Sequence, residues 1–198
     1  MNSKLPTDSP RCDWVSRDPL YIQYHDTEWG VPQYDSLALF EKICLEGQQA
    51  GLSWITVLKK REHYRHCFHH FDPEKIIAMT DADIDHLMQD TGLIRNRLKL
   101  NAIVTNARAY QKMQAEDESF SEFIWSFVQH TPVVNRYQSI AEVPAVTETA
   151  EQLSKALKKK GFKFVGPTIC YAFMQSMGLV NDHLTTCICH PGYKHKKP

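Results

Sequence analysis

The stretch "LSKALKKKGFKFVGPTICYAFMQSMG", Leu153–Gly178, decides the fold, because two helical segments meet there across a short apolar turn. Gly161 suits the end of the first helix, and Pro167 suits the first position of the second. Backbone amides at the start of the second helix are free to bind an anion, and Gly166 leaves room for its approach. Positive charge beside the turn comes from Lys155, Lys158, Lys159, Lys160 and Lys163. A phosphodiester fits this site, although an ordinary helical packing corner with a solvated lysine face fits the spacing too.

Apolar residues at helical spacing dominate the rest of the chain as well. They predict helices over residues 35–47, 53–68, 71–79, 80–92, 94–113, 119–128 and 147–161, besides the one that runs from Pro167 to Gly178. The main irregular stretch covers residues 131–144, and the alternation typical of strands is hardly visible. We therefore expect an all-α protein of roughly seven or eight short helices.

Local signals indicate the buried sides and the ends of these helices. Leu37, Phe40, Ile43 and Cys44 share one face of the first predicted helix, and Gly47 is expected to end it. Side-chain caps are expected at three later helix starts, namely Asp72 before Pro73, Thr80 with Asp83, and Thr149 with Gln152.

Length and charge limit the classes of protein that this chain can belong to. Its 198 residues contain 23 basic and 23 acidic side chains, which argues against a grossly basic nucleic-acid binder but allows a local basic face. We expect one domain over residues 11–192, between a flexible tail (1–10) and a basic tail (193–198). Neither a membrane span nor the apolar segment of a signal peptide is visible, so we expect a cytoplasmic protein without a membrane partner.

The spacing of cysteines and histidines predicts a metal site. A cytosolic setting disfavours disulfides among the six cysteines. Two cysteines and two histidines can form a closed tetrahedral zinc site, and the candidates are Cys12, His25, His183 and Cys187. One structural zinc ion there would join the N-terminal and C-terminal segments. Buried thiols and hydrogen-bonded histidines remain the alternative, and Cys189 and His190 compete as ligands.

An acid among aromatic residues predicts a binding pocket. Glu46 lies at the predicted end of a helix, and the aromatic residues near it in sequence are Tyr21, Tyr24, Trp29 and Trp54. A planar cation gains about 1–2 kcal/mol from each desolvated aromatic face, and a carboxylate accepts a hydrogen bond from an exocyclic amine. A solvated helix end beside core tryptophans is the alternative.

The hairpin and the segment after it resemble the helix-hairpin-helix of the endonuclease III superfamily of DNA glycosylases. The pattern is carried by "KFVGPTICYAFMQSMGLVNDH", although Phe-Lys replaces the first Pro-Gly of that superfamily. Asn181 stands where the superfamily has its catalytic aspartate, and Asp182 is expected to point elsewhere. The chemistry must therefore differ from that of the aspartate-dependent members.

Three long blocks extend the resemblance to most of the chain. They are "CDWVSRDPLYIQYHDTEWGVP", "LFEKICLEGQQAGLSWITVLKKRE" and "KGFKFVGPTICYAFMQSMGLVNDH", and from about Cys12 to Gly192 the chain is similar to the DNA-3-methyladenine glycosylase I family. The resemblance implies an all-α helix-hairpin-helix fold with zinc on the same four ligands. It also implies a base pocket formed by Glu46, Tyr24 and Trp54, with Tyr21 and Trp29 as neighbours, and it accounts for Asn181.

The activity that this resemblance implies is removal of 3-methyladenine from double-stranded DNA. The flipped base would stack on Trp54 and Tyr24, and Glu46 would accept hydrogen bonds from its amino edge. Because the base is cationic, its glycosidic bond is already weak, and water completes the hydrolysis to free 3-methyladenine and an abasic site. No lysine is placed for Schiff-base chemistry, so we expect a monofunctional enzyme, monomeric and without an organic cofactor.

The remaining candidates concern DNA contacts. Gln49, Gly51 and Leu52 are expected to fill the gap that the flipped base leaves, while Lys163 and Gly166 are expected to hold the phosphate backbone. Two other functions remain open. One is a helix-hairpin-helix glycosylase for another lesion, and the other is a zinc-containing DNA-structure binder without catalysis.

Overall fold

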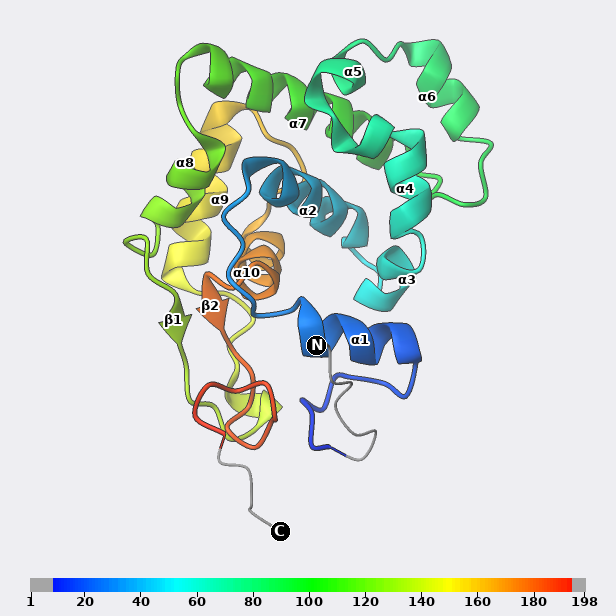
Figure 1. Cartoon of the computed structure of the whole chain (residues 1–198). Helices are drawn as coiled ribbons and strands as arrows, with labels where there is room; N and C mark the ends of the chain where they lie inside the picture. Colours follow the sequence, from blue (N-terminus) through cyan, green and yellow to red (C-terminus); the bar gives the residue numbers. More distant parts are fainter. Residues whose placement is uncertain (1–8, 194–198) are drawn as a thin grey trace.

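The computed structural model describes residues 9–193, and within that range helices are the main secondary structure, with long loops and one very small sheet (Figure 1). Most of the expected tails (1–10 and 193–198) therefore lies outside the described residues. The α-helices are α1 (Pro19–Thr27), α2 (Ser36–Gln49), α3 (Trp54–Leu58), α4 (Arg61–Cys67), α5 (Pro73–Ile77), α6 (Asp81–Leu87), α7 (Arg97–Ala115), α8 (Phe120–Ser126), α9 (Glu148–Lys160) and α10 (Pro167–Ser176). Short 3-10 turns cover His69–Phe71 and Ile140–Glu142, and β1 (Val133–Val134) pairs in parallel with β2 (Val180–Asn181).

The capping residues explain where many of these helices begin. The predicted caps at Asp72 and Thr80 are confirmed, and Thr80 forms a full capping box with Asp83. The predicted cap at Thr149 is wrong, because the side chain of Thr147 accepts the backbone N–H of Ala150 and α9 begins two residues earlier.

Three predicted boundaries are corrected by the structure. Gly47 does not end α2 but lies inside it, where an added Cβ would stand 3.1 Å from Cβ of Phe164. The predicted helix over 53–68 is divided into α3 and α4, and the one over 80–92 ends at Leu87. Leu37 does not share the buried face of α2, since it is 48% exposed. The division of the helix over 53–68, together with α1, which was not predicted, brings the number of α-helices within residues 9–193 to ten.

The predicted hairpin is present as α9, a short turn and α10. Gly161 ends α9 with φ of +103°, a conformation that costs glycine little and other residues more. Phe162 and Val165 bury their side chains almost completely and fix the turn on the core. The side chain of Asn106 in α7 accepts the backbone N–H of Lys163 at 2.7 Å and donates to its carbonyl at 3.2 Å. The hairpin is therefore held against both α2 and α7.

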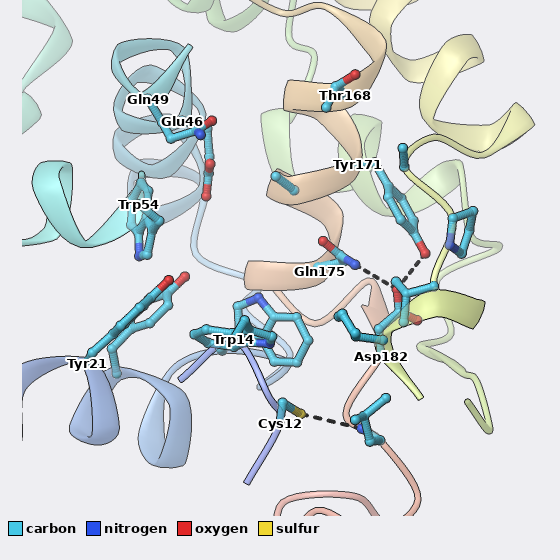
Figure 2. A pocket seen from close by; sticks show the side chains of 18 residues that line it. Cys12, Trp14, Tyr21, Glu46, Gln49, Trp54, Thr168, Tyr171, Gln175 and Asp182 are labelled. Carbon is cyan, nitrogen blue, oxygen red and sulfur yellow. Dashed lines mark hydrogen bonds between the residues drawn. The ribbon is translucent and has the colours of Figure 1, made fainter. Parts of the chain in front are cut away.

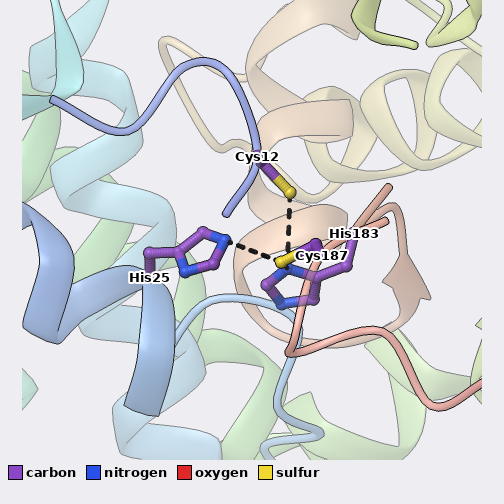
Figure 3. A group of neighbouring side chains, drawn as sticks. All are labelled: Cys12, His25, His183 and Cys187. Carbon is purple, nitrogen blue, oxygen red and sulfur yellow. Dashed lines mark hydrogen bonds between the residues drawn. The ribbon is translucent and has the colours of Figure 1, made fainter. Parts of the chain in front are cut away.

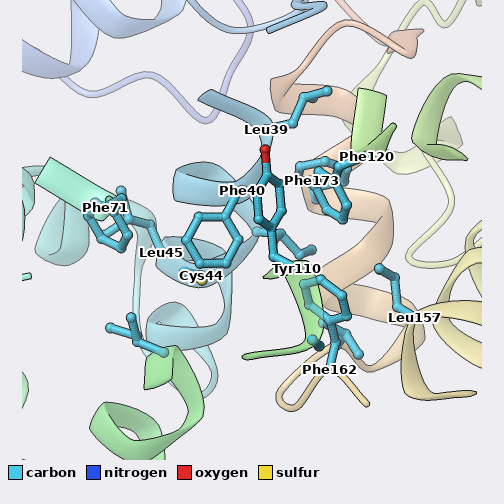
Figure 4. Packing of buried hydrophobic residues seen from close by; sticks show 14 of the residues in the cluster. Leu39, Phe40, Cys44, Leu45, Phe71, Tyr110, Phe120, Leu157, Phe162 and Phe173 are labelled. Carbon is cyan, nitrogen blue, oxygen red and sulfur yellow. The ribbon is translucent and has the colours of Figure 1, made fainter. Parts of the chain in front are cut away.

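Helix α2 occupies the centre of the core. Figure 4 shows Phe40 of α2 beside Tyr110 of α7, and their ring centroids are 5.0 Å apart. Phe120 of α8 stacks on Phe162 of the hairpin turn at 5.5 Å. Burying such large rings supplies most of the driving force for packing the helices together. The end of α2 is thereby placed next to α10 and the hairpin.

Residues near the two ends of the described chain lie side by side. The backbone N–H of Ile188 donates to the carbonyl of Pro10 at 3.0 Å, and Thr185 N–H donates to the carbonyl of Tyr137 at 2.9 Å. The stretch over 131–144 was expected to be irregular, but two of its residues form β1. The pairing of β1 with β2 places this stretch beside the C-terminal segment that follows β2. Within the described range, no helix is both long and apolar enough to cross a membrane.

Candidate functional site

A cavity of about 400 Å³ opens between α1, the α2–α3 junction and α10 (Figure 2). Aromatic and small apolar side chains form most of its wall, and two carboxylates enter it. The lining residues are Cys12, Trp14, Tyr21, Tyr24, Trp29, Glu46, Gln49, Trp54, Ile140, Val143, Pro144, Ala145, Thr168, Tyr171, Ala172, Gln175, Asp182 and Leu184. Its size and composition suit a flat ligand such as a nucleobase.

Glu46 lies in the last turn of α2 and is only 3% exposed, so it is not the solvated helix end of the alternative interpretation. Burial raises the pKa of its carboxyl, while Lys42 one turn earlier and a hydrogen bond from Ser176 oppose that rise. Oε1 of Glu46 is 3.2 Å from Nζ of Lys42. The pocket therefore contains a desolvated acid with one close counter-ion.

The predicted aromatic residues surround this acid. Tyr24 and Trp54 have ring centroids 5.6 Å apart, and Tyr21 stacks on Tyr24 at 6.4 Å. Among the side chains of the described residues, the indole nitrogen of Trp54 is the buried polar atom that has no hydrogen-bond partner. In Figure 2 it points toward Tyr21. Because orphaned buried donors are costly, this N–H is a donor available to a ligand.

The side chain of Asp182 does not have the orientation that was expected from the sequence. It was expected to point away, but it lines the cavity and is 2% exposed. Its carboxylate accepts hydrogen bonds from the hydroxyl of Tyr171 at 2.5 Å, from Gln175 Nε2 at 2.8 Å and from Asn135 Nδ2 at 2.7 Å. These bonds fix the carboxylate against α10. Asn181 instead directs Nδ2 to the carbonyl of Gly30, at 3.5 Å.

Trp29 was predicted as a neighbour of the pocket, and it lines the cavity from a loop after α1. It also packs against the candidate metal ligands, with its ring 4.6 Å from that of His183. Trp14, which sequence reasoning missed, packs edge-on against Trp29 at 5.0 Å and against His25 at 5.3 Å. One wall of the pocket is therefore built directly on the cysteine–histidine cluster.

The four candidate metal ligands come together as predicted (Figure 3). Their ligand atoms all lie within 4.8 Å of one another, and all four residues are buried. Cys187 Sγ is 3.4 Å from His25 Nε2 and 3.5 Å from His183 Nδ1, while Cys12 Sγ is 3.6 Å from His183 Nδ1. Two thiols and two imidazoles in this arrangement are a donor set that suits tetrahedral zinc.

The hydrogen bonds around the cluster also fit a metal site. His25 uses its other ring nitrogen to bind Asp26 at 2.8 Å, and His183 uses its other nitrogen on the carbonyl of Trp29 at 3.0 Å. Such bonds hold a metal-binding imidazole in one tautomer and orientation. The competing ligand His190 is directed away, because its Nε2 contacts the carbonyl of Asn135 at 3.0 Å. Cys189 Sγ lies 3.9 Å from the other ring nitrogen of His25, Nδ1, and Cys189 is not one of the four residues whose ligand atoms gather together.

The candidate gap-filling residues lie at the rim of the cavity, where α2 ends. Gln49 lines the cavity, and its side-chain amide donates to the carbonyl of Leu52. Leu52 is 38% exposed, so its side chain is accessible at this rim. Gly51 has φ of +78°, so the loop turns there in a conformation that favours glycine.

The candidate phosphate-binding residues lie at the hairpin turn. Gly166 precedes α10, and no side chain caps the free amides that follow it. Its φ of −64° is ordinary, and a Cβ added there would meet no protein atom within 4 Å. Neither the backbone conformation nor a neighbouring protein atom therefore requires glycine at this position, and the space over it is open. The side chain of Lys163 is exposed nearby, whereas Lys160 is partly neutralised by a salt bridge to Glu118.

Sequence reasoning missed several side chains of this site. The missed wall residues are Trp14, Thr168, Tyr171, Gln175 and Asp182. The largest omission is Lys42, whose Nζ donates to the hydroxyl of Tyr24 at 2.8 Å and lies 3.5 Å from the ring centroid of Trp54. Its position four residues before Glu46 is a signal that could have indicated an ion pair.

A helical fold with an aromatic, acid-containing pocket beside a helical hairpin is the combination expected of the DNA glycosylase class. More specifically, residues 14–190 match the family described as methyladenine glycosylase, and the chain belongs to that family. It is 62% identical over 184 residues to DNA-3-methyladenine glycosylase 1 of Escherichia coli (strain K12), covering 93% of this chain and 98% of the relative. It is 64% identical over 179 residues to DNA-3-methyladenine glycosylase of Haemophilus influenzae, covering 90% and 97%.

Solved structures agree with this assignment. A crystal structure of 3-methyladenine DNA glycosylase I superposes with a TM-score of 0.91 at 62% identity, covering 92% of this chain and all of that one (100%). A structure from Staphylococcus aureus, described as the structural basis of 3-methyladenine recognition, has a TM-score of 0.88 at 45% identity and covers 93% of this chain and 97% of that one. The mostly helical fold predicted from the sequence is therefore confirmed.

Proposed function

We infer that this chain is a DNA-3-methyladenine glycosylase of base excision repair. It hydrolyses the N-glycosidic bond of 3-methyladenine in alkylated DNA, releases the free base and leaves an abasic site. The observation that carries this inference is the buried carboxylate of Glu46 in an aromatic pocket that also offers the unpartnered N–H of Trp54. The curated relatives, at 62% and 64% identity over nearly the whole chain, support the same activity.

The charge of the substrate explains why an aromatic pocket with an acid suits this reaction. Methylation at N3 makes the adenine cationic, so stacking on Tyr24 and Trp54 gains a cation–π contribution. Glu46, ionised in a desolvated site, favours this cation over a neutral adenine and accepts hydrogen bonds from its amino edge. The electrons of the glycosidic bond move to the base, which leaves neutral. Water adds its hydroxyl to the sugar carbon and releases a proton.

The lesion must leave the helix before it reaches this pocket. We propose that α9 and α10 act as a helix-hairpin-helix that grips the phosphate backbone, through the open amides after Gly166 and the charge of Lys163. Gln49, Gly51 and Leu52 stand at the rim of the same pocket and would enter the gap in the duplex. No base-specific contact to the flanking DNA is needed, because the lesion itself is read in the pocket.

We also propose one structural zinc ion per chain, held by Cys12, His25, His183 and Cys187. When bound, it supplies a crosslink between segments far apart in sequence and takes no part in the reaction. The chain's own residues then hold Trp14 and Trp29 in the pocket wall. Metal analysis of protein purified without chelator should find about one zinc per chain, and a folded, active protein without zinc would disprove the site.

Other features of the enzyme stay predictions. We propose a catalytic domain over residues 11–192, acting as a monomer on double-stranded DNA in the bacterial cytoplasm without an organic cofactor. The enzyme is monofunctional, and Lys42, though near the pocket, directs its nitrogen to Glu46, Tyr24 and Trp54 rather than into the cavity.

Base release from methylated DNA tests the proposed function. Purified protein is incubated with methylated duplex DNA without added cofactor, and the released bases are separated by chromatography. We expect 3-methyladenine and little 7-methylguanine. Release of a different base would favour a glycosylase for another lesion, and release of none by folded protein would favour a DNA binder without catalysis.

Binding of free 3-methyladenine to a charge-neutral variant tests the role of Glu46. Glu46→Gln should reduce the affinity for the free base by about 10–100-fold, since hydrogen bonds to a charged group contribute about 1.5–3 kcal/mol. Glu41→Gln is the matched control, because Glu41 lies on the same helix and pairs with Arg65 outside the pocket. Equal affinities for the two variants would remove Glu46 from the binding site.

A further inference from the structure

Lys42 is a buried cation whose contacts all belong to the base pocket, although it does not line the cavity. It lies on α2 one turn before Glu46 and is 5% exposed. Its Nζ is 3.2 Å from Oε1 of Glu46, 2.8 Å from the hydroxyl oxygen of Tyr24 and 3.5 Å from the ring centroid of Trp54. The ring centroid of Tyr24 is also within 4.7 Å of Nζ.

These contacts pair the charge of the ammonium group and use its hydrogen-bond donors. A buried lysine is tolerated only where its charge is paired and its donors are used. Here the carboxylate takes the charge, the tyrosine oxygen accepts a hydrogen bond, and the face of the indole provides a cation–π contact. Each of these three partners is a residue that the proposed mechanism places against the base.

We propose that Lys42 is a positioning residue for base recognition, which keeps Glu46 ionised and holds Glu46, Tyr24 and Trp54 in the arrangement that receives the base. This inference rests on the proposed function. By donating to the oxygen of Tyr24, Lys42 leaves the hydroxyl proton of that residue free to point elsewhere. By covering one face of Trp54, it directs the base to the remaining exposed part of the indole.

Ionisation of Glu46 depends on a balance that Lys42 controls. Burial alone raises the pKa of the Glu46 carboxyl, and the nearby ammonium of Lys42 is the main opposing influence. The other titratable or charged groups that face the pair are Tyr21 and Tyr24 from α1, Glu28 at its end and Arg61 from α4. None of them is a second counter-ion in contact with the carboxylate, since Arg61 is bound to Glu28.

The same charge also moderates the attraction of the pocket for a cation. With both partners ionised the pair is neutral, so Lys42 offsets part of the field that Glu46 applies to a cationic base. Removing Lys42 should therefore impair recognition at the acid end of the pH range and not at the alkaline end. At low pH the carboxyl becomes protonated and recognition fails, while at high pH the bare carboxylate binds the cation at least as well as before.

The test compares Lys42→Met, Lys42→Arg and wild type, with Lys112→Met as a control at a lysine side chain that is 72% exposed. The first measurement is the pKa of the Glu46 carboxyl, by carbon-13 NMR of protein with labelled glutamate. The second is kcat/KM for 3-methyladenine release between pH 5.5 and 9. Circular dichroism checks that each variant is folded, and Lys42→Gln, which keeps a donor, replaces Lys42→Met if that variant fails to fold.

For Lys42→Met we expect the pKa of Glu46 to rise by at least about one unit, which corresponds to a tenfold loss of kcat/KM on the acid side. The deficit should disappear near pH 9, and Lys42→Arg and Lys112→Met should follow wild type. A folded neutral variant with an unchanged Glu46 titration would overturn the proposal. If wild type releases no base at all, the proposed function fails, while the NMR titration still decides whether Lys42 controls Glu46.

Discussion

Replacing Gly166 by alanine should weaken DNA binding without destabilising the protein. The backbone at this residue has φ of −64°, which alanine adopts freely, and the added methyl group meets no protein atom within 4 Å. Glycine-to-alanine changes at compatible positions stabilise proteins by about 0.4–1 kcal/mol through the unfolded chain. Gly166 is also the N-cap of α10, where alanine is less favourable than glycine, so the two effects offset each other and the melting temperature should stay close to that of wild type.

The effect on DNA follows from what the methyl group excludes. If a phosphate oxygen approaches the amides at the start of α10, a Cβ on Gly166 stands in its path. Charge-assisted hydrogen bonds of this kind contribute about 1.5–3 kcal/mol. Their loss corresponds to roughly 10–100-fold weaker binding of an undamaged duplex. Fluorescence anisotropy with a labelled duplex, at low and moderate salt, measures this directly.

Gly47→Ala is the matched variant, since it adds the same methyl group where space is lacking. The new Cβ would stand 3.1 Å from Cβ of Phe164 and 3.3 Å from its carbonyl oxygen. Overpacking costs about 1–3 kcal/mol, which exceeds the gain of about 1 kcal/mol for alanine in a helix. This variant should therefore lower the melting temperature, which Gly166→Ala should not do.

Two results would refute the reasoning on Gly166. Unchanged affinity for duplex DNA at both salt concentrations would mean that the backbone of the hairpin turn does not contact phosphate. A lower melting temperature for Gly166→Ala would mean that the space over this residue is needed within the protein itself.

Three further outcomes are expected. Phe162→Ala should destabilise the fold by about 3–5 kcal/mol in urea titrations because its ring is 1% exposed, whereas Leu98→Ala, at 71% exposure, should change little. Cys187→Ala should abolish stoichiometric zinc and lower the melting temperature, while Cys189→Ala should retain the metal; equal zinc in both would contradict the ligand set. Burial lowers the pKa of Lys42 from 10.5 to about 8, so the unfolded chain binds more protons between these values and stability should rise with pH there, by at most about 3 kcal/mol. Lys42→Met should lack this rise in pH-dependent unfolding, and an identical slope in both proteins would contradict it.

The parts of the fold that could be predicted are those with local causes. Gly161 and Pro167 act on their own stretch of backbone, so the hairpin followed from the sequence, as did the capping box at Thr80. Gly47 shows the limit of this reasoning. A glycine after a helical run is typical of a helix end, but here it allows close contact with Phe164, which is distant in sequence.

The candidate site was predictable to a similar degree. Glu46 and its aromatic neighbours form the pocket, and the four cysteine and histidine side chains lie together. The orientation of Asp182 could not be predicted, because a two-residue strand and three hydrogen bonds from other segments decide it. Trp14 was missed because nothing in its own stretch shows that it packs against Trp29.

The residues that form the pocket wall are synthesised at very different times. Cys12, Trp14 and Trp29 leave the ribosome early, but their partners Asp182 and His183 are added more than 150 residues later. Translation at roughly 5–20 residues per second separates the two events by several seconds or more. A chain that stops before residue 182 lacks Asp182 and Leu184 of the cavity wall and two of the four clustered cysteine and histidine residues, His183 and Cys187.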